Sequence, residues 1–544
     1  MRRRDLLGKM AGAVSAGMLF NFPQAKADKH TVDRLPGGSP EHWYDVRRFG
    51  ARGDGKTNDA SAIQKAIDAC SANGGGVVLL HNGTFRSGAI ILKDHVELHL
   101  TSTAVLLGSS DIHDFHEDHQ FNHGEPVRSF VHADSCRHIA ITGSGTIDGQ
   151  GHLFESGGSY AVRPFLIQLR SCQDVRIENV LLHNSAVWAC WLLQCERVVV
   201  DQVRIDNPIS PNRDGIDIDG CKEVRISNCH ITTEDDSLAF KVSERGHPCR
   251  DVVITNCILS SQCAAIRFGP DAADDIENVT ISNCVIRDTR LNGIKIQEAM
   301  GAAIRNITFS NIVMDNVRGP VSIRVAGWQL NPGDSAPFEI NDSRWESGTL
   351  QNILFNNIQA TMPADNICIS LTGTSKTRPR QITFSNLDFT FAGGGTARQG
   401  SRRHVPDLDR HYPEMSIFGE LPAYGMYIHH ASGIRMENVK FRLADRDLRP
   451  ALVCDDVDQL DLSGFQVAGD RDAESAIRLQ NCQEVFIEGS RTLNETGTFL
   501  RVEGAESKAV FLTGNLLHGA KNIVETTTEV DRSEIRLLNN FQRQ

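Results

Sequence analysis

A short hydrophobic segment that closes on asparagine recurs along this chain. The copies DVRIEN, EVRISN, DVVITN, NVTISN and NITFSN end at Asn179, Asn228, Asn256, Asn283 and Asn311, and later copies end at Asn357, Asn386 and Asn438. From Asn228 to Asn311 the successive copies are 28, 27 and 28 residues apart. Self-similarity at a fixed period of this length is the sequence signature of a solenoid, in which each repeat stacks on the next.

Each repeat has the pattern of short strands. Valine, isoleucine and phenylalanine alternate with polar residues, and Gly, Asn and Asp separate the runs. Stacked coils of such strands form parallel sheets with inward-facing apolar side chains, and asparagines that recur at one turn can hydrogen-bond to one another. We therefore predict an all-β chain that folds as a right-handed parallel β-helix. The hand follows the general rule for parallel crossover connections.

One helix and two interruptions are expected within this solenoid. The stretch TNDASAIQKAIDACSANGGG places Ile63, Ala66, Ile67 and Cys70 on one helical face, which predicts a short helix covering the N-terminal end. The repeat breaks near residues 326–349 and 391–430, which we interpret as insertions in a single catalytic domain of residues 28–544. Long loops of a solenoid usually rim its binding face.

The first 27 residues differ from the rest of the chain. Arg2, Arg3 and Arg4 precede an apolar-rich stretch, and Ala25-Lys26-Ala27 offers small residues for cleavage, so we expect an export signal of the twin-arginine type. The mature protein would then be periplasmic or secreted by a bacterium, without a membrane segment. Removing five positive charges and one negative charge changes the formal charge from -12 to -16, which argues against a nucleic-acid partner.

The cysteines and histidines do not predict a metal site. Of the 14 Cys, three follow the repeat asparagine, at Cys229, Cys257 and Cys284, which favours stacked, buried thiols over disulfides or metal ligands. The stretch DIHDFHEDHQFNHGE carries His113, His116, His119 and His123, and we interpret it as a loop at the cleft rim, with a zinc site as the less favoured alternative. We expect no cofactor and no metal.

Three carboxylates fall in register in adjacent repeats. Aligning the apolar pairs of successive coils, from Ile216 and Ile218 to Leu238 and Phe240, places Asp214 directly beneath Asp236, with Asp235 one residue away. Acids on a solvated loop have no reason to repeat in register. A cluster of acids that perturb one another's pKa values is typical of a catalytic site. Trp188 and Trp191 lie one coil earlier, where either a sugar-stacking role or a core role is open.

These motifs resemble glycoside hydrolase family 28, the polygalacturonases and their relatives. Asn212-Arg213-Asp214 and Glu234-Asp235-Asp236 are similar to the family's Asn-Thr-Asp and Gly-Asp-Asp, with Thr and Gly replaced. The opening YDVRRFGARGDGKTND and the segment YPEMSIFGELPAYGMYI extend the resemblance over most of the mature chain. The resemblance implies a hydrolase acting on galacturonan-type or rhamnogalacturonan-type pectic substrates, and it gives the family's acidic roles to Asp214, Asp235 and Asp236.

Two further family motifs are altered. Cys263-Ala264-Ala265 stands where the family has Gly-His-Gly, and Lys295-Ile296-Gln297 stands where it has Arg-Ile-Lys. In the family the His supports the acid cluster and the cationic pair holds a uronate carboxylate. The departures favour an exo-acting or side-chain-specific hydrolase over a plain endo-polygalacturonase.

An inverting mechanism suits three crowded acids. It needs a protonated carboxyl group for the departing oxygen and a second carboxylate, about 6.5 to 9.5 Å away, that activates water. Mutual repulsion raises the pKa of at least one member of the cluster. We predict Asp235 as the general acid and Asp214 with Asp236 as the base pair on water. The expected partner is an acidic plant-type polysaccharide or oligosaccharide, and we expect a monomer.

Cations follow the acids on the same sheet face. The outward position of successive coils holds Arg267, then Lys295 and, if Ile323 and Val325 continue the apolar ladder, Arg324. We predict that these three cations, with Asn212, bind the substrate and hold a uronate carboxylate. The alternative is that a Glu or Asp from a loop pairs with each cation.

Two other functions remain open from the sequence. A polysaccharide lyase acting on uronates would hold calcium with acids, and Asp217 and Asp219 lie close enough to Asp214 to suggest an ion site. A glycan-binding protein without catalysis is the second, since departures from family motifs can mark an inactive enzyme.

Overall fold

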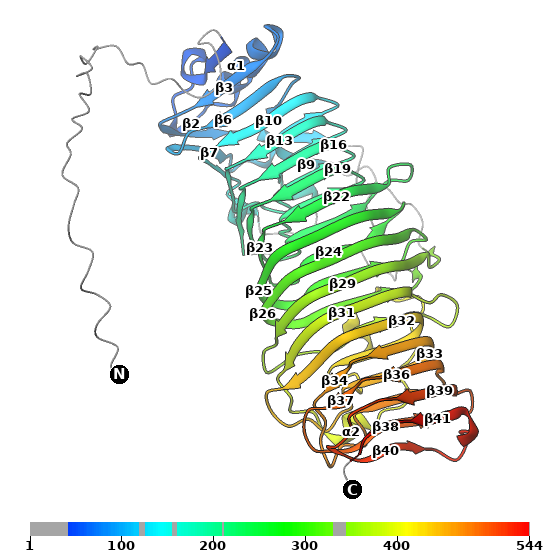
Figure 1. Ribbon diagram of the computed structural model, residues 1–544. Helices are drawn as coiled ribbons and strands as arrows, with labels where there is room; N and C mark the ends of the chain where they lie inside the picture. Colours follow the sequence, from blue (N-terminus) through cyan, green and yellow to red (C-terminus); the bar gives the residue numbers. More distant parts are fainter. Residues whose placement is uncertain (1–41, 119–125, 155–159, 209–210, 330–343, 543–544) are drawn as a thin grey trace, which may run out of the picture. The chain divides into compact units, whose positions relative to one another are not determined.

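The structure of the chain is a computed structural model that describes residues 42–118, 126–154, 160–208, 211–329 and 344–542. Residues 42–544 form one compact unit, whose described part is a parallel β-helix, as the repeat predicted, with the right-handed sense expected from the crossover rule (Figure 1). The predicted export signal of residues 1–27 lies outside the described residues, as do His119 and His123. No helix among the described residues is long and apolar enough to cross a membrane.

Stacked strands build the coils in the register that the repeat indicates. Strand β16 (Glu196–Asp201) pairs in parallel with β19 (Lys222–Ser227), β19 with β22 (Cys249–Thr255), and β22 with the long β25 (Ile276–Glu298). One inward ladder of this sheet consists of Val198, Val224, Val252 and Val279. All four side chains are buried, so stacking coils buries a continuous apolar core.

The recurring asparagines form a ladder at one turn. All eight have a left-handed backbone, with φ from 50° at Asn438 to 63° at Asn179. Asn tolerates this conformation better than most residues because its short amide can hydrogen-bond locally. The side-chain amide of Asn311 donates to Oδ1 of Asn283 at 3.1 Å, and Asn357 donates to Asn311 at 2.7 Å. The left-handed backbone and the hydrogen bonds between coils therefore both favour asparagine at this position of the repeat.

Helix α1 (Ala60–Ala72) lies at the N-terminal end of the coils, as predicted (Figure 1). Its four predicted apolar residues are all fully buried. Oδ1 of Asn58 accepts the backbone N–H of Ala60, while the Asp59 carboxylate accepts those of Arg52 and Gly53. Asn58 thus binds the first residue of the helix, and Asp59 holds the loop that precedes it.

Four strands carry the candidate site: β18 (Ile216–Asp219), β21 (Leu238–Val242), β24 (Ala264–Ala272) and β25. Ile216 pairs with Leu238, Leu238 with Ile266, and Ile266 with Ile294, which confirms the alignment of the apolar pairs. The outward positions of this ladder are Asp217, Ala239, Arg267 and Lys295.

The predicted place of Arg324 is wrong. In β26 (Ala303–Val325) Ser322 pairs with Lys295, whereas Arg324 pairs with Gln297. The register slips between Thr289 and Asn292, so this coil takes one residue fewer than its predecessor. A shift of two residues preserves the inward and outward alternation of a strand, and the sequence pattern could not detect it.

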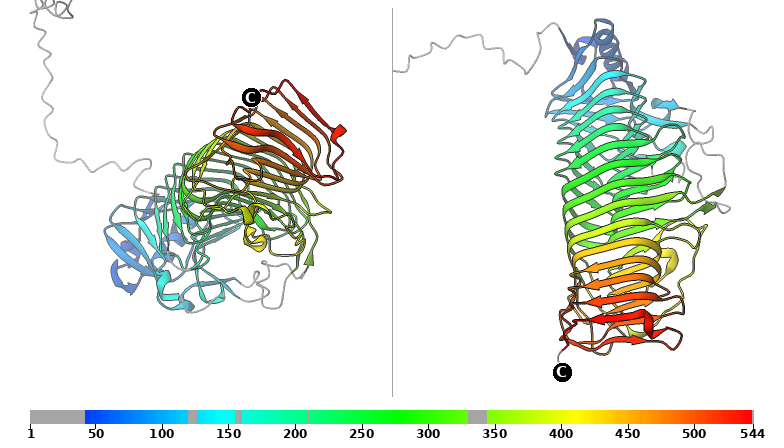
Figure 2. Two further views of the ribbon diagram at one scale, coloured as in Figure 1. Left: turned by 90° about the horizontal axis from the view of Figure 1, so that it is seen from below. Right: turned by 45° about the vertical axis from the view of Figure 1, so that its right-hand side comes forward.

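Two stretches leave the coils. Between β26 and β29 (Thr349–Thr361), the short strands β27 (Trp328–Gln329) and β28 (Arg344–Trp345) pair antiparallel. Between β31 (Arg380–Phe391) and β32 (Met426–Leu443) runs a segment that includes helix α2 (Ala397–Gly400), drawn in yellow beside the coils (Figure 2). We call residues 392–425 the bridging segment. Residues 426–430 belong to β32 rather than to an insertion.

All 14 cysteines are free thiols, and all except Cys263 are buried. Cys229, Cys257 and Cys284 occupy equivalent places in three successive coils, where each Sγ contacts the backbone carbonyl two residues earlier. The prediction of stacked, buried thiols is confirmed.

Candidate active site

Adjacent coils bring Asp214, Asp235 and Asp236 together at the N-terminal ends of β18 and β21. The backbone N–H of Gly215 donates to the carbonyl of Asp236 at 2.9 Å, and that of Asp235 donates to the carbonyl of Arg213 at 3.3 Å. Asp214 and Asp236 are buried, whereas Asp235 is half-buried. Among the three, Asp235 is therefore the carboxylate with the most open approach from solvent.

Asp236 is held in its ionised form. Its Oδ2 lies 2.9 Å from the guanidinium Nη1 of Arg267, and its Oδ1 accepts the backbone N–H of Ala264 at 3.2 Å. Burial by itself would raise the pKa of Asp236, but the nearby cations Arg267, Lys295 and Lys241 outweigh it and lower the pKa.

The pKa of Asp235 is shifted in the opposite direction from that of Asp236. Burial, and then the negative charge of Asp236, raise the pKa of Asp235 above its ordinary value. One carboxylate oxygen of each acid and the Sγ of Cys263 all lie within 4.8 Å of one another. Cys263 thus lies beside the acids at the first position of the segment that stands in place of the family's Gly-His-Gly, and Ala264 occupies the place of the histidine. Two consecutive carboxyl groups with opposite pKa shifts can divide the roles of acid and base between them.

Lys241 is a site residue that the sequence reasoning missed. Its Nζ lies 3.2 Å from Oδ2 of Asp214 and 2.7 Å from Oδ1 of Asp217, and also 3.4 Å from the ring centre of Trp188. Burial raises the pKa of both Asp214 and Asp217, to about 7 for Asp217, although Lys241 opposes it. The signal was present in the sequence, because Lys241 is a lone cation in the apolar run LAFKV.

The acids considered for a lyase-type calcium site are engaged by protein groups. Asp217 pairs with Lys241, as described above. Asp219 accepts the backbone N–H of Ser243 at 2.7 Å, the Ser243 hydroxyl at 2.6 Å and the indole N–H of Trp191 at 3.1 Å. These contacts make Asp219 a structural acceptor beneath the site.

The bridging segment contributes two side chains that sequence reasoning did not place. Oε1 of Glu414 lies 2.6 Å from Nζ of Lys295, and the hydroxyl of Tyr412 accepts a hydrogen bond from Arg267. The Lys295 side chain is 0% exposed, so the contact with Glu414 covers it. For Lys295 the structure therefore has the alternative that the sequence left open, in which a carboxylate from a loop pairs with the cation. Periodicity could not find Glu414, because the segment lies outside the repeat.

Arg324 and Asn212 lie at the edges of this cluster. Arg324 is buried, with its guanidinium 4.8 Å from the ring centre of Phe418 and a hydrogen bond of 2.5 Å to the carbonyl of Leu408, so it contacts the bridging segment. Oδ1 of Asn212 accepts a hydrogen bond from Arg163 at 3.0 Å.

The two tryptophan candidates are less exposed than a sugar platform requires, whereas His113 is exposed and His116 is half-buried. Trp188 and Trp191 belong to a buried cluster with Val127, Phe165, Val187 and Leu193, which places both in a core. His116 packs against His132, with ring centres 4.1 Å apart and the rings tilted by 31°, and burial lowers the pKa of His116.

The chain is similar to known glycosidases. The sequence profile of glycosyl hydrolases family 28 matches residues 94–404, and that of rhamnogalacturonase A/epimerase, pectate lyase-like proteins matches residues 43–127. A probable polygalacturonase of Vitis vinifera is 31% identical over 278 residues, which cover 46% of this chain and 56% of the relative. The chain thus spans little more than half the length of that relative.

An exo-poly-alpha-D-galacturonosidase of Dickeya chrysanthemi is 26% identical over 425 residues, covering 66% of this chain and 69% of the relative. Among solved structures, the family 28 exopolygalacturonase of Yersinia enterocolitica aligns with a TM-score of 0.62 and 20% identity over 78% of each chain. At that identity the structural likeness supports the β-helix fold.

Proposed function

The chain belongs to glycosyl hydrolases family 28, and from this premise we propose that it hydrolyses glycosidic bonds of pectic galacturonan with inversion at the anomeric carbon. The observation that carries the proposal is the pair Asp235 and Asp236. These consecutive acids have opposite pKa shifts, and Asp214 of the preceding coil joins them. Such a division of protonation states is what acid and base roles need at one site.

Each carboxyl group has a defined part in the proposed reaction. Asp235 donates its proton to the departing glycosidic oxygen as the bond to the anomeric carbon breaks. Asp236, kept ionised by Arg267, acts with Asp214 to take a proton from the water that attacks the same carbon. Lys241 positions Asp214 through its 3.2 Å contact.

We propose that Arg267 and Lys295, with Asn212 and Arg324 at the edges, form the substrate-binding side of the site. The cations Arg267 and Lys295 point from neighbouring coils toward the bridging segment. In this proposal a uronate carboxylate competes with Glu414 for Lys295, because both are carboxylates of the same charge. Binding of an acidic substrate then involves displacement of Glu414.

The relatives named as exo-acting enzymes, together with the altered motifs at Cys263 and Lys295, favour cleavage from chain ends. The decisive experiment is product analysis over time on polygalacturonate and on pectic oligosaccharides of defined length. Exo action releases one short product from the first time point, whereas endo action produces a ladder. A lyase is distinguished by an unsaturated, ultraviolet-absorbing product and by loss of activity with a chelator.

For the N-terminal residues we propose the export role that their arginines and apolar stretch indicate. Expression in a bacterium with and without a functional twin-arginine pathway, followed by N-terminal sequencing of the exported protein, tests it. Cleavage after Ala27 is the expected result.

A further inference from the structure

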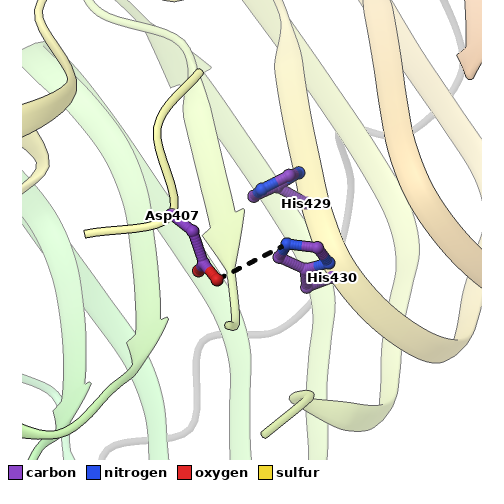
Figure 3. Close-up of side chains that lie close together, drawn as sticks. All are labelled: Asp407, His429 and His430. Atoms are coloured by element: carbon purple, nitrogen blue, oxygen red, sulfur yellow. Dashed lines mark ion pairs between the residues drawn. The ribbon is translucent and has the colours of Figure 1, made fainter. Parts of the chain in front are cut away.

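A second group of ligand-type side chains lies away from the acid cluster. His429 and His430 stand on β32, and Asp455 and Asp456 stand on β33 (Leu452–Ser463), with His429 paired to Asp455 in the sheet. Asp407 reaches the two histidines from the bridging segment (Figure 3). His429 is in the same column of paired residues as Gln297, three coils further toward the C-terminus.

The backbone places both imidazoles on one side. Consecutive side chains of a strand normally point to opposite faces. His430 has a left-handed φ of 50°, which breaks that alternation at the corner of the coil. The two rings consequently lie side by side, with centres 3.8 Å apart. Figure 3 shows both rings beside the Asp407 carboxylate.

Each histidine has a carboxylate behind it. Nδ1 of His430 lies 2.5 Å from Oδ2 of Asp456, which also pairs with Arg378 at 2.6 Å. Nδ1 of His429 lies 3.2 Å from Oδ2 of Asp455. A carboxylate hydrogen-bonded to one ring nitrogen fixes the tautomer in which the other nitrogen carries a lone pair, as at most metal-binding histidines, and His430 has this arrangement. Nδ1 of His429 lies near Asp455 but has no hydrogen-bond partner among the described residues.

Asp407 supplies a carboxylate whose partners are incomplete. Oδ2 accepts the backbone N–H of Ser375 at 3.1 Å and lies 4.0 Å from Nε2 of His430. Oδ1 is buried, and within the described part of the chain no group donates a hydrogen bond to it. One ligand atom from each of Asp407, His429 and His430 lies within 4.8 Å of the others. An ion bonded at about 2.0 to 2.2 Å to each atom spans such separations after a small closure.

We propose that Asp407, His429 and His430 bind one divalent transition-metal ion, of which Zn²⁺ is the probe. Two imidazoles and one carboxylate are a ligand set that suits zinc better than calcium or magnesium, which prefer oxygen ligands. The ion joins β32 to the bridging segment seven residues before Glu414, the side chain that covers Lys295. It is a structural clamp for that segment and takes no part in the bond cleavage.

The simpler explanation is that the histidines and aspartates are corner ion pairs without an ion. It accounts for the contacts of Asp455 and Asp456, but not for the buried Oδ1 of Asp407, to which no group among the described residues donates a hydrogen bond. The two explanations differ in a measurable way, because only a metal site takes up zinc with defined stoichiometry.

The test is calorimetric titration of Zn²⁺ into the full chain after chelator treatment, together with thermal unfolding with and without the metal. We expect one site that is lost in His430→Asn, a variant chosen because Asn accepts a left-handed backbone. Asp456→Asn, which removes the carboxylate behind His430, should lower the affinity about 10- to 100-fold. The matched control is His411→Asn, an exposed histidine in the same segment.

Zinc should raise the melting temperature of the wild type and of His411→Asn, and leave that of His430→Asn unchanged. Far-ultraviolet circular dichroism of His430→Asn without metal checks that the variant is folded. Equal zinc stoichiometry in the wild type and His430→Asn would overturn the proposal, and so would a wild type that binds no zinc. Because the readouts are metal binding and stability, the outcome does not depend on whether the chain hydrolyses pectin.

Discussion

Nζ of Lys241 lies 2.7 Å from Oδ1 of Asp217, and neither side chain is more than 7% exposed. The same ammonium group also contacts Asp214, so a single buried cation lies between two buried carboxylates. One positive charge cannot balance two negative charges in a site of low dielectric. Burial therefore outweighs the attraction of Lys241 and raises the pKa of Asp217 to about 7.

Asp217→Asn should flatten the pH dependence of stability. The pKa of Asp217 is about 7 in the folded chain, where burial raises it from 3.8. Protonation of this group thus favours the fold, and its contribution is fully present below 3.8 and lost as the pH rises through about 7. Urea unfolding across that range should show the free energy of unfolding of the wild type falling with pH relative to that of Asp217→Asn. The exposed control Asp461→Asn should follow the wild type, and parallel curves for wild type and Asp217→Asn would contradict the prediction.

Asp235→Asn should lower kcat on pectic oligosaccharides by at least about 100-fold, as expected when a general acid is removed. Folding should be intact, because the half-buried Asp235 side chain is replaced by an isosteric amide. Glu234→Gln is the matched control, since Glu234 is the half-buried carboxylate next to it. A near-normal rate for Asp235→Asn removes this residue from the mechanism.

The configuration of the first product should be inverted. Proton magnetic resonance of fresh hydrolysate resolves the anomeric signals before mutarotation equilibrates them. Inversion is the outcome when one carboxyl group protonates the leaving oxygen and others activate water. A product with retained configuration would require one of the acids to act as a nucleophile.

Lys295→Ala should impair cleavage of uronate-containing substrates far more than that of neutral analogues, and added salt should reproduce part of the loss in the wild type. Glu414→Gln should lower KM for uronate-containing substrates, because it removes the carboxylate that contacts Lys295 at 2.6 Å. Lys376→Ala, which alters an exposed cation paired with Asp409, is the control. Equal effects on charged and neutral sugars would exclude Lys295 as a uronate-binding residue.

Asn283→Ala should destabilise the β-helix more than Asn283→Gly. Both variants lose the hydrogen bond from Asn311 at 3.1 Å and that to Thr255 at 3.2 Å. Only Ala also bears the cost of the left-handed backbone at φ 56°, about 1 to 2 kcal/mol for a residue with a Cβ atom. Chemical denaturation of the two variants measures the difference, and equal stabilities would show that the backbone conformation relaxes.

The sequence was sufficient for the features that depend on a period. The asparagine ladder and the inward pairs from Ile216 to Ile296 follow from a pattern that successive coils repeat. The helix at Ala60–Ala72 follows from its own local apolar face. Arg324 was misplaced because its coil is one residue shorter, and a strand has the same alternation after a shift of two residues.

The site residues that the sequence did not reveal were missed for different physical reasons. Lys241 was missed because a lone cation inside an apolar strand indicates a buried ion pair but does not show which carboxylates form it. Glu414 comes 119 residues after Lys295, from a segment that lies outside the repeat, and no pattern of spacing predicts such a contact. The histidine pair of β32 gains its third candidate ligand only through the fold, since Asp407 lies 22 residues before His429.

The bridging segment changes how such a stack can come apart. In a solenoid each repeat contacts only its neighbours, so coils can fray one after another from an end. This segment touches Arg267 of β24 through Tyr412 and Glu503 of β38 (Thr496–Glu503) through Arg403, which is 2.6 Å away. The coils between these two strands therefore share a long-range restraint and should melt as one cooperative block, whereas the coils before β24 can unravel independently. Hydrogen exchange would display this as a step in amide protection along the solenoid axis.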